Sequence, residues 1–61
     1  MKRKKLIEKR KECGYTQVTF AKKLGTMQPS ISSIENGHTN PTFKMIKQIL
    51  KVLDCTFEEI F

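Results

Sequence analysis

The chain has 61 residues and a formal net charge of +6, so we expect one small domain, covering residues 1–61, with a single core. Its two cysteines form no CxxC pair and have no histidine cluster nearby, which argues against a metal site or a disulfide framework and favours reduced thiols in a cytosolic protein. No segment is apolar enough to span a membrane or to act as a secretory signal. The basic charge suits nucleic acid, although lysines that only keep a small protein soluble would fit equally well.

Residues 2–13 are predicted to form the first helix, with Leu6, Arg10 and Cys13 on one stripe and lysines largely around it. A basic helix on a membrane surface would share this charge, but it needs residues such as Trp or Phe on its inner face, and this segment has none. Gly14 then predicts a C-terminal stop in the left-handed conformation.

The second helix is predicted to begin after Thr16, which is a suitable N-cap residue. Phe20, Ala21 and Leu24 form its inward face at helical spacing, and Gly25 ends it. The turn that follows is tight, and another amphipathic segment begins directly after it.

This third segment, residues 28–36, carries Ile31 and Ile34 on one face at helical spacing. Small uncharged polar groups surround that face: Gln28, Ser30, Ser32 and Ser33. A solvated helix face is normally charged, whereas Gln and Ser at the front of a helix can reach base edges and phosphate oxygens. The pattern therefore predicts a helix-turn-helix that reads DNA with residues 28–36.

The residues at both ends of this segment indicate where the helix begins and where it stops. Met27 occupies the N-cap position without a hydroxyl or carboxylate, at a cost of about 1 kcal/mol, although Thr26 could cap one residue earlier. Pro29 is tolerated in the first turn, where its missing N–H would have no partner. Asn36 and Gly37 predict the stop, with Gly37 left-handed.

Glu35 lies near the C-terminus of the predicted third helix, where the helix dipole disfavours a negative charge. Its presence therefore predicts a neighbouring cation, for which Arg10 is the candidate. If the pair is largely buried, removing one partner should lower the free energy of unfolding by about 3–5 kcal/mol, because the other charge is left buried without a partner.

A polar loop follows, and its His38 is expected to be a surface residue, because it has no acidic or thiol companion for catalysis or metal binding. Thr42 can cap a fourth helix. That helix carries apolar residues at core spacing: Phe43, Ile46, Ile49, Leu50 and Leu53. Thr56 can cap a last short helix, residues 57–61. No strand pattern appears, so the predicted class is all-α with five helices.

Several segments together point to a known family. They are Arg10, GYTQ at 14–17, FAKKLG at 20–25, SISSIENG at 30–37, Asn40-Pro41 and the tail ILKVLDCTFEEIF. In order and spacing they resemble the Cro and phage-repressor (XRE-like) family of helix-turn-helix regulators over nearly the whole chain. The resemblance implies a compact, lambda-repressor-like bundle whose third helix enters the major groove and whose second lies across the backbone. It also implies a dimer on half-sites about 34 Å apart in a palindromic operator.

The same resemblance implies which residues contact DNA. Gln28 is the expected base reader, because a Gln amide can pair with adenine N6 and N7. Pro29 and Met27 could touch a thymine methyl, although packing is the favoured role for Met27. Ser33 is a short base contact, so readout of the sequence would be narrower or would lean more on DNA shape. The expected phosphate contacts are Gln17, Ser30, Ser32, Asn36, Thr39, Asn40, Thr42 and Lys44. Gln17 fits equally as an ordinary exposed helix residue.

Self-association is expected at the ends of the fourth and fifth helices, through Met45, Phe57 and Phe61. Each of these could instead belong to the core, Phe57 more readily than Met45. Such a homodimer would be weak in isolation and would form mainly on DNA, where adjacent subunits reinforce each other.

The sequence thus predicts a cytoplasmic, bacterial or phage-encoded transcriptional repressor that binds double-stranded DNA and needs no cofactor. An antitoxin-type autorepressor with a toxin partner is an alternative, because short relatives with QPSIS and NPT elements also occur beside toxin genes. A helical protein-interaction module is a second class, but a serine-rich face is poor material for an interface hot spot. Enzyme activity is not expected, since the chain has one His and no room for a cleft.

Overall fold

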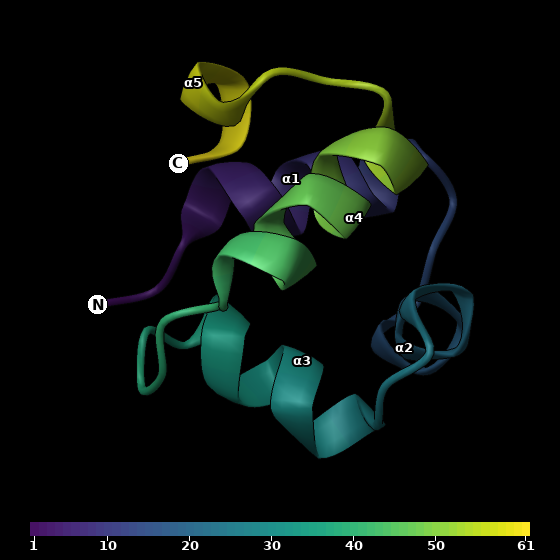
Figure 1. Cartoon of the computed structure of the whole chain (residues 1–61), viewed down its shortest axis with the longest axis vertical. Coiled ribbons are helices and arrows are strands. Elements are labelled where there is room, and N and C mark those ends of the chain that lie inside the picture. The colour runs from purple at the N-terminus through teal and green to yellow at the C-terminus, as the bar shows by residue number, and fades with distance from the viewer.

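The computed structural model describes residues 1–61 and contains five helices without a strand, which confirms the predicted all-α class. They are α1 (Lys4–Glu12), α2 (Gln17–Leu24), α3 (Gln28–Glu35), α4 (Phe43–Leu53) and α5 (Phe57–Ile60). In Figure 1, α2 and α3 lie at the lower side of the molecule, α4 crosses above α3, and α5 lies at the opposite end beside α1. No helix has the combination of length and apolar character that crossing a bilayer requires.

The start of α1 differs from the prediction of residues 2–13, because Arg3 is not helical (φ −86°, ψ 77°). Its backbone N–H donates to the carbonyl oxygen of Glu35 (2.7 Å), so the first three residues run beside the end of α3. Gly37 has φ +77°, and the carbonyl of Met1 occupies the space that a Cβ atom on this glycine would need. Conformation and close approach both require glycine here.

The predicted caps of the helices are partly confirmed. Thr16 forms a reciprocal capping box with Thr19, and Thr42 accepts a hydrogen bond from the backbone N–H of Met45 (3.1 Å). Met27 caps α3 without a side-chain hydrogen bond, as expected. Thr56 does not cap: its hydroxyl donates to Glu59 Oε1 (3.3 Å), because a carboxylate at N3 competes for the hydroxyl.

Removing the Thr16 hydroxyl should therefore destabilise the fold more than removing that of Thr56. The Thr16 Oγ1 accepts from the Thr19 backbone N–H (3.1 Å), so Thr16→Ala should lower the free energy of unfolding by about 1 kcal/mol. Thr56→Ala serves as the control and should change it by less than about 0.5 kcal/mol. Urea unfolding followed by circular dichroism measures both values, and equal losses would contradict the assigned caps.

The core is a cluster of nine buried apolar residues contributed by all five helices. Its members are Leu6, Phe20, Ala21, Leu24, Ile31, Ile34, Ile49, Leu53 and Ile60. Phe43 was expected among them but is 73% exposed, with Lys47 Nζ 5.1 Å from its ring centre. Phe43 is the first residue of α4 and extends past the core, whereas Met45 in the same turn packs against it. Ile46 and Leu50, on the same stripe, are only half-buried.

Cys13 also departs from the expected stripe: it is the C-cap of α1 and is exposed, with its Sγ 3.8 Å from the carbonyl oxygen of Leu53. Cys55 lies after α4 and is half-buried. Burial, and secondly the carboxylate of Glu59, raise the pKa of the Cys55 thiol, so this thiol is protonated at neutral pH.

Candidate nucleic-acid interface

The turn between α2 and α3 presents α3 at the edge of the molecule (Figure 1). Gly25 ends α2 in the left-handed conformation (φ 72°), and the Thr26 N–H donates back to the carbonyl oxygen of Ala21 (2.9 Å). α3 then buries Ile31, Ile34 and Glu35. The rest of this helix faces away from the core.

The outward face of α3 is polar and uncharged. Pro29 and Ser30 are exposed, and Gln28, Ser32 and Ser33 are half-buried at its sides. Met27, just before the helix, is 72% exposed, so the packing role favoured from sequence is wrong. A thioether at this place is free to touch an apolar group of a ligand.

The stretch of chain that contains α2, α3 and α4 lacks exposed negative charge. Between Cys13 and Leu53 the only acidic residue is Glu35, and its side chain is buried beside a guanidinium. The lysines of the same stretch are all exposed: Lys22, Lys23, Lys44, Lys47 and Lys51. This part of the protein therefore offers only positive charge to a polyanion.

The buried guanidinium belongs to Arg10 of α1. Its Nε donates to Glu35 Oε2 (2.6 Å) and its Nη2 to Glu35 Oε1 (3.3 Å), while its Nη1 donates to the carbonyl oxygen of Tyr15 (2.8 Å). The two side chains are 7% and 2% exposed. The pair links α1 to α3 beneath the outward face, and its geometry is that of a forked charge-assisted contact.

Two glutamines extend this pair to the surface. Gln17 Nε2 donates to Glu35 Oε1 (2.9 Å), and Gln28 Nε2 donates to Gln17 Oε1 (2.6 Å). Gln17 is half-buried, so the alternative of an ordinary exposed helix residue is wrong. The chain of bonds fixes the direction of the Gln28 amide and leaves its Oε1 and one N–H available to a ligand.

The other residues predicted at phosphates lie along α3, in the loop that follows and at the start of α4. Asn36 Nδ2 donates to Ser32 Oγ (3.3 Å), and Thr39 Oγ1 donates to Ser33 Oγ (3.2 Å). Lys44, in the first turn of α4, is exposed and makes no ion pair. A hollow of about 310 Å³ separates α3 from the loop. It is lined by Pro29, Ser30, Ser33, Ile34, Thr39 and Asn40.

One residue of this region was missed by the sequence analysis. The guanidinium of Arg3 donates to the carbonyl oxygen of Ile34 (2.7 Å) and to Asn40 Oδ1 (2.7 Å), so it spans the end of α3 and the loop. Arg3 is the one arginine in the run of basic residues at positions 2–5, but the prediction placed it inside the first helix rather than before it. Only the late start of α1 frees it for these contacts.

Among the residues predicted for self-association, the structure reverses the expected burial of Met45 and Phe57. Met45 is half-buried and packs against the core, whereas Phe57 is 46% exposed, so the favoured assignment of Phe57 to the core is wrong. The Phe57 and Phe61 rings stack with centroids 5.0 Å apart. Phe57 begins α5 at the surface, and only Ile60 of that helix reaches the core.

Comparison with known proteins relates the sequence to helix-turn-helix modules. A family model described as helix-turn-helix matches residues 6–60. Two proteins of Archaeoglobus fulgidus, each named an uncharacterized HTH-type transcriptional regulator, are 32% identical over 59 residues, which is 97% of this chain and 84% or 83% of theirs. Antitoxin HigA1 of Mycobacterium tuberculosis is 35% identical over 50 residues, 82% of this chain but only 34% of the antitoxin. No solved structure gives a significant match.

Proposed function

The chain belongs to the helix-turn-helix family, whose modules bind DNA and are not enzymes, and from this premise we propose that it is a sequence-specific transcriptional repressor. The observation that carries the proposal is the outward face of α3, which is polar and uncharged and belongs to a stretch of chain whose exposed charges are all lysines. A face of this kind offers hydrogen bonds to base edges, and the lysines attract the phosphates. The two Archaeoglobus relatives named as transcriptional regulators support the same role.

In the proposed complex α3 enters the major groove and Gln28 reads a base, with adenine as the preferred partner. The amide of Gln28 is held by Gln17 in the free protein, so it is oriented before DNA arrives. Pro29, Met27 and Ser33 provide smaller contacts to bases. Because these groups are short or apolar, the shape of the DNA contributes to the choice of site.

Phosphates are bound on both sides of this helix. At the start of α2, Gln17 offers a backbone N–H at a helix N-terminus, where anions are favoured. On the other side lie Asn36 and the loop that follows, including Thr39 and Asn40. Thr42 uses its oxygen to cap α4, and its hydroxyl proton is left for a phosphate.

The salt dependence of DNA binding should reveal the contact from Lys44. Lys44→Ala should weaken binding to all duplexes and reduce the slope of log K against log salt by about 0.9, the share of one phosphate. Lys11→Ala is the control, because Lys11 is also an exposed lysine but lies on α1, outside the proposed interface. A titration at several salt concentrations measures both slopes, and an unchanged slope in Lys44→Ala would reject the contact.

The repressor is proposed to act as a homodimer formed on DNA, with half-sites about one helical turn, ~34 Å, apart. Phe57 is 46% exposed and its ring stacks on that of the half-buried Phe61, so a second subunit could cover this aromatic pair. A selection of bound duplexes from a random library, at stated salt, tests the proposal. It should return a palindromic sequence with adenine at the position read by Gln28, whereas a library without enrichment would contradict sequence-specific binding.

The antitoxin role is a second candidate, favoured by the 35% identity to Antitoxin HigA1. The chain spans about a third of that protein, so its partners are not carried over. In this version the chain would repress its own gene and also bind a toxin. A toxin-like reading frame beside the gene, whose product copurifies with this chain, would support it, and their absence would favour a plain repressor.

A further inference from the structure

The side chain of Arg3 joins three segments at one edge of the candidate interface. Its Nη1 donates to the carbonyl oxygens of Ile34 at the end of α3 (2.7 Å) and of Thr39 in the loop (3.3 Å), and its Nη2 donates to Asn40 Oδ1 (2.7 Å). The backbone N–H of Arg3 donates to the carbonyl oxygen of Glu35 (2.7 Å). Four hydrogen bonds from one residue therefore tie the start of the chain to α3 and to the loop.

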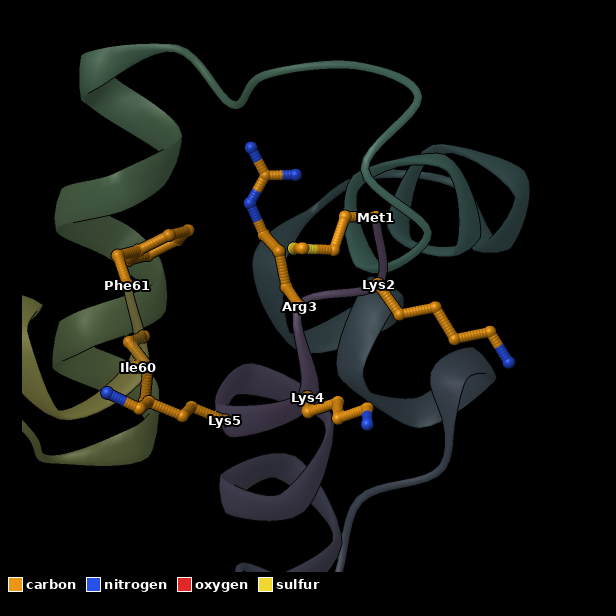
Figure 2. A pocket seen from close by; sticks show the side chains of 7 residues that line it. All are labelled: Met1, Lys2, Arg3, Lys4, Lys5, Ile60 and Phe61. Carbon is orange, nitrogen blue, oxygen red and sulfur yellow. The ribbon is translucent and has the colours of Figure 1, made fainter.

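The position of this guanidinium is itself fixed. Figure 2 shows it extending from the start of α1 toward the loop between α3 and α4, with the Phe61 ring on one side. The Cζ atom lies 5.9 Å from the centre of that ring, within the range of a cation–π contact. The neighbouring Lys5 points elsewhere, along Ile60. Arg3 is thus the one basic residue at this end of the molecule that is directed into the loop.

The loop has few other connections to α3. The N–H groups of His38 and Thr39 donate to the carbonyl oxygen of Ser33 (3.0 and 3.4 Å), and the Thr39 hydroxyl donates to Ser33 Oγ (3.2 Å). Asn40 makes no side-chain hydrogen bond except the one with Arg3. Without the guanidinium, the loop side of the 310 Å³ hollow would be tied to α3 only through the bonds from His38 and Thr39 to Ser33.

We propose that Arg3 is a positioning residue for DNA binding. By holding Thr39 and Asn40 at a fixed distance from α3, it gives the hollow the shape that receives a phosphate of the DNA strand beside the reading helix. This inference rests on the proposed function. It adds Arg3, which lies just before α1, to the residues that contribute to DNA binding. A planar, forked side chain suits this task, because it binds several acceptors at once in one geometry, which a lysine cannot do.

A loop that is not held must be ordered when DNA binds, and that ordering reduces affinity. Arg3→Met should therefore weaken binding to the selected duplex about 10-fold, and Arg3→Lys nearly as much despite its retained charge. In the free protein, amide hydrogen exchange at His38 and Thr39 should become about 10-fold faster in both variants, while exchange at Ile49 in the core stays unchanged.

The matched control is Lys5→Met, which removes the same charge from the same end of the molecule without touching the loop. It should leave exchange at His38 and Thr39 unchanged and should weaken DNA binding only slightly. Two results would overturn the positioning role of Arg3. In the first, Arg3→Met lowers the salt slope by about one phosphate while exchange in the loop is unaltered, which would make Arg3 a direct contact. In the second, exchange at Ile49 rises as much as in the loop, which would make its role general stability.

The two measurements also separate this inference from the function on which it rests. Hydrogen exchange is measured without DNA, and affinity is measured on a duplex that the wild-type protein has selected. A wild-type protein that prefers no duplex would overturn the proposed function. Normal loop exchange in Arg3→Met, in a protein that does select a duplex, would overturn the positioning role alone.

Discussion

Arg10→Met should lower the free energy of unfolding by about 3–5 kcal/mol, because it strands the carboxylate of Glu35 in the interior. That side chain is 2% exposed and would keep only the hydrogen bond from Gln17. Adding Glu35→Leu removes the stranded charge, so the double variant should be more stable than Arg10→Met alone. Urea unfolding of the wild type, both single variants and the double variant gives the coupling energy directly.

A surface pair provides the control for this cycle. Lys9 Nζ lies 4.0 Å from Glu59 Oε2, with side chains 28% and 52% exposed, so Lys9→Met should cost less than about 1 kcal/mol. Two results would contradict the structural role of the buried pair. In the first, Arg10→Met lowers the free energy of unfolding no more than Lys9→Met does. In the second, the double variant is less stable than Arg10→Met alone.

Gln28→Ala should cost about 1–3 kcal/mol of binding energy on the selected duplex and should relax the preference at one base position. The truncation removes the Gln28 Oε1 and the N–H that is not donated to Gln17, while Gln17 keeps its bond to Glu35. Binding to unrelated duplexes, which depends on phosphates, should change little. Competition titrations with duplexes altered at each position measure the effect.

Gln48→Ala is the matched control for this substitution, since it truncates a half-buried glutamine of α4, outside the proposed interface. It should leave both affinity and base preference unchanged. Equal loss on every duplex in Gln28→Ala would assign this residue to backbone contacts or to stability and would reject base reading.

The features that follow from local rules were predictable from the sequence. The Thr16 cap, the left-handed Gly25 and the buried stripe of α2 depend on neighbouring residues only, and the structure confirms them. The fold class followed from these elements, since each short helix has one apolar stripe and can bury it only against the others. Family membership was predicted from the order of several segments and is confirmed by the match over residues 6–60.

The features that depend on tertiary position were not predictable. Phe43 has core spacing on its helix, but where the core ends is set by the packing of the other four helices. The link between Gln17 and Gln28 joins side chains eleven residues apart, and either amide could equally have faced solvent. Arg3 lies 31 residues from Ile34, and its contacts exist only because α1 and α3 pack together.

The central claim is that the outward face of α3 reads DNA sequence. Its most direct test is the ratio of dissociation constants for the selected duplex and a scrambled duplex of equal length and composition, at physiological ionic strength. We predict tighter binding to the selected duplex by a factor of about 10³ or more, falling toward the nonspecific level when Gln28 and Ser33 are both replaced by Ala. Equal dissociation constants for the two duplexes in the wild-type protein would contradict the claim.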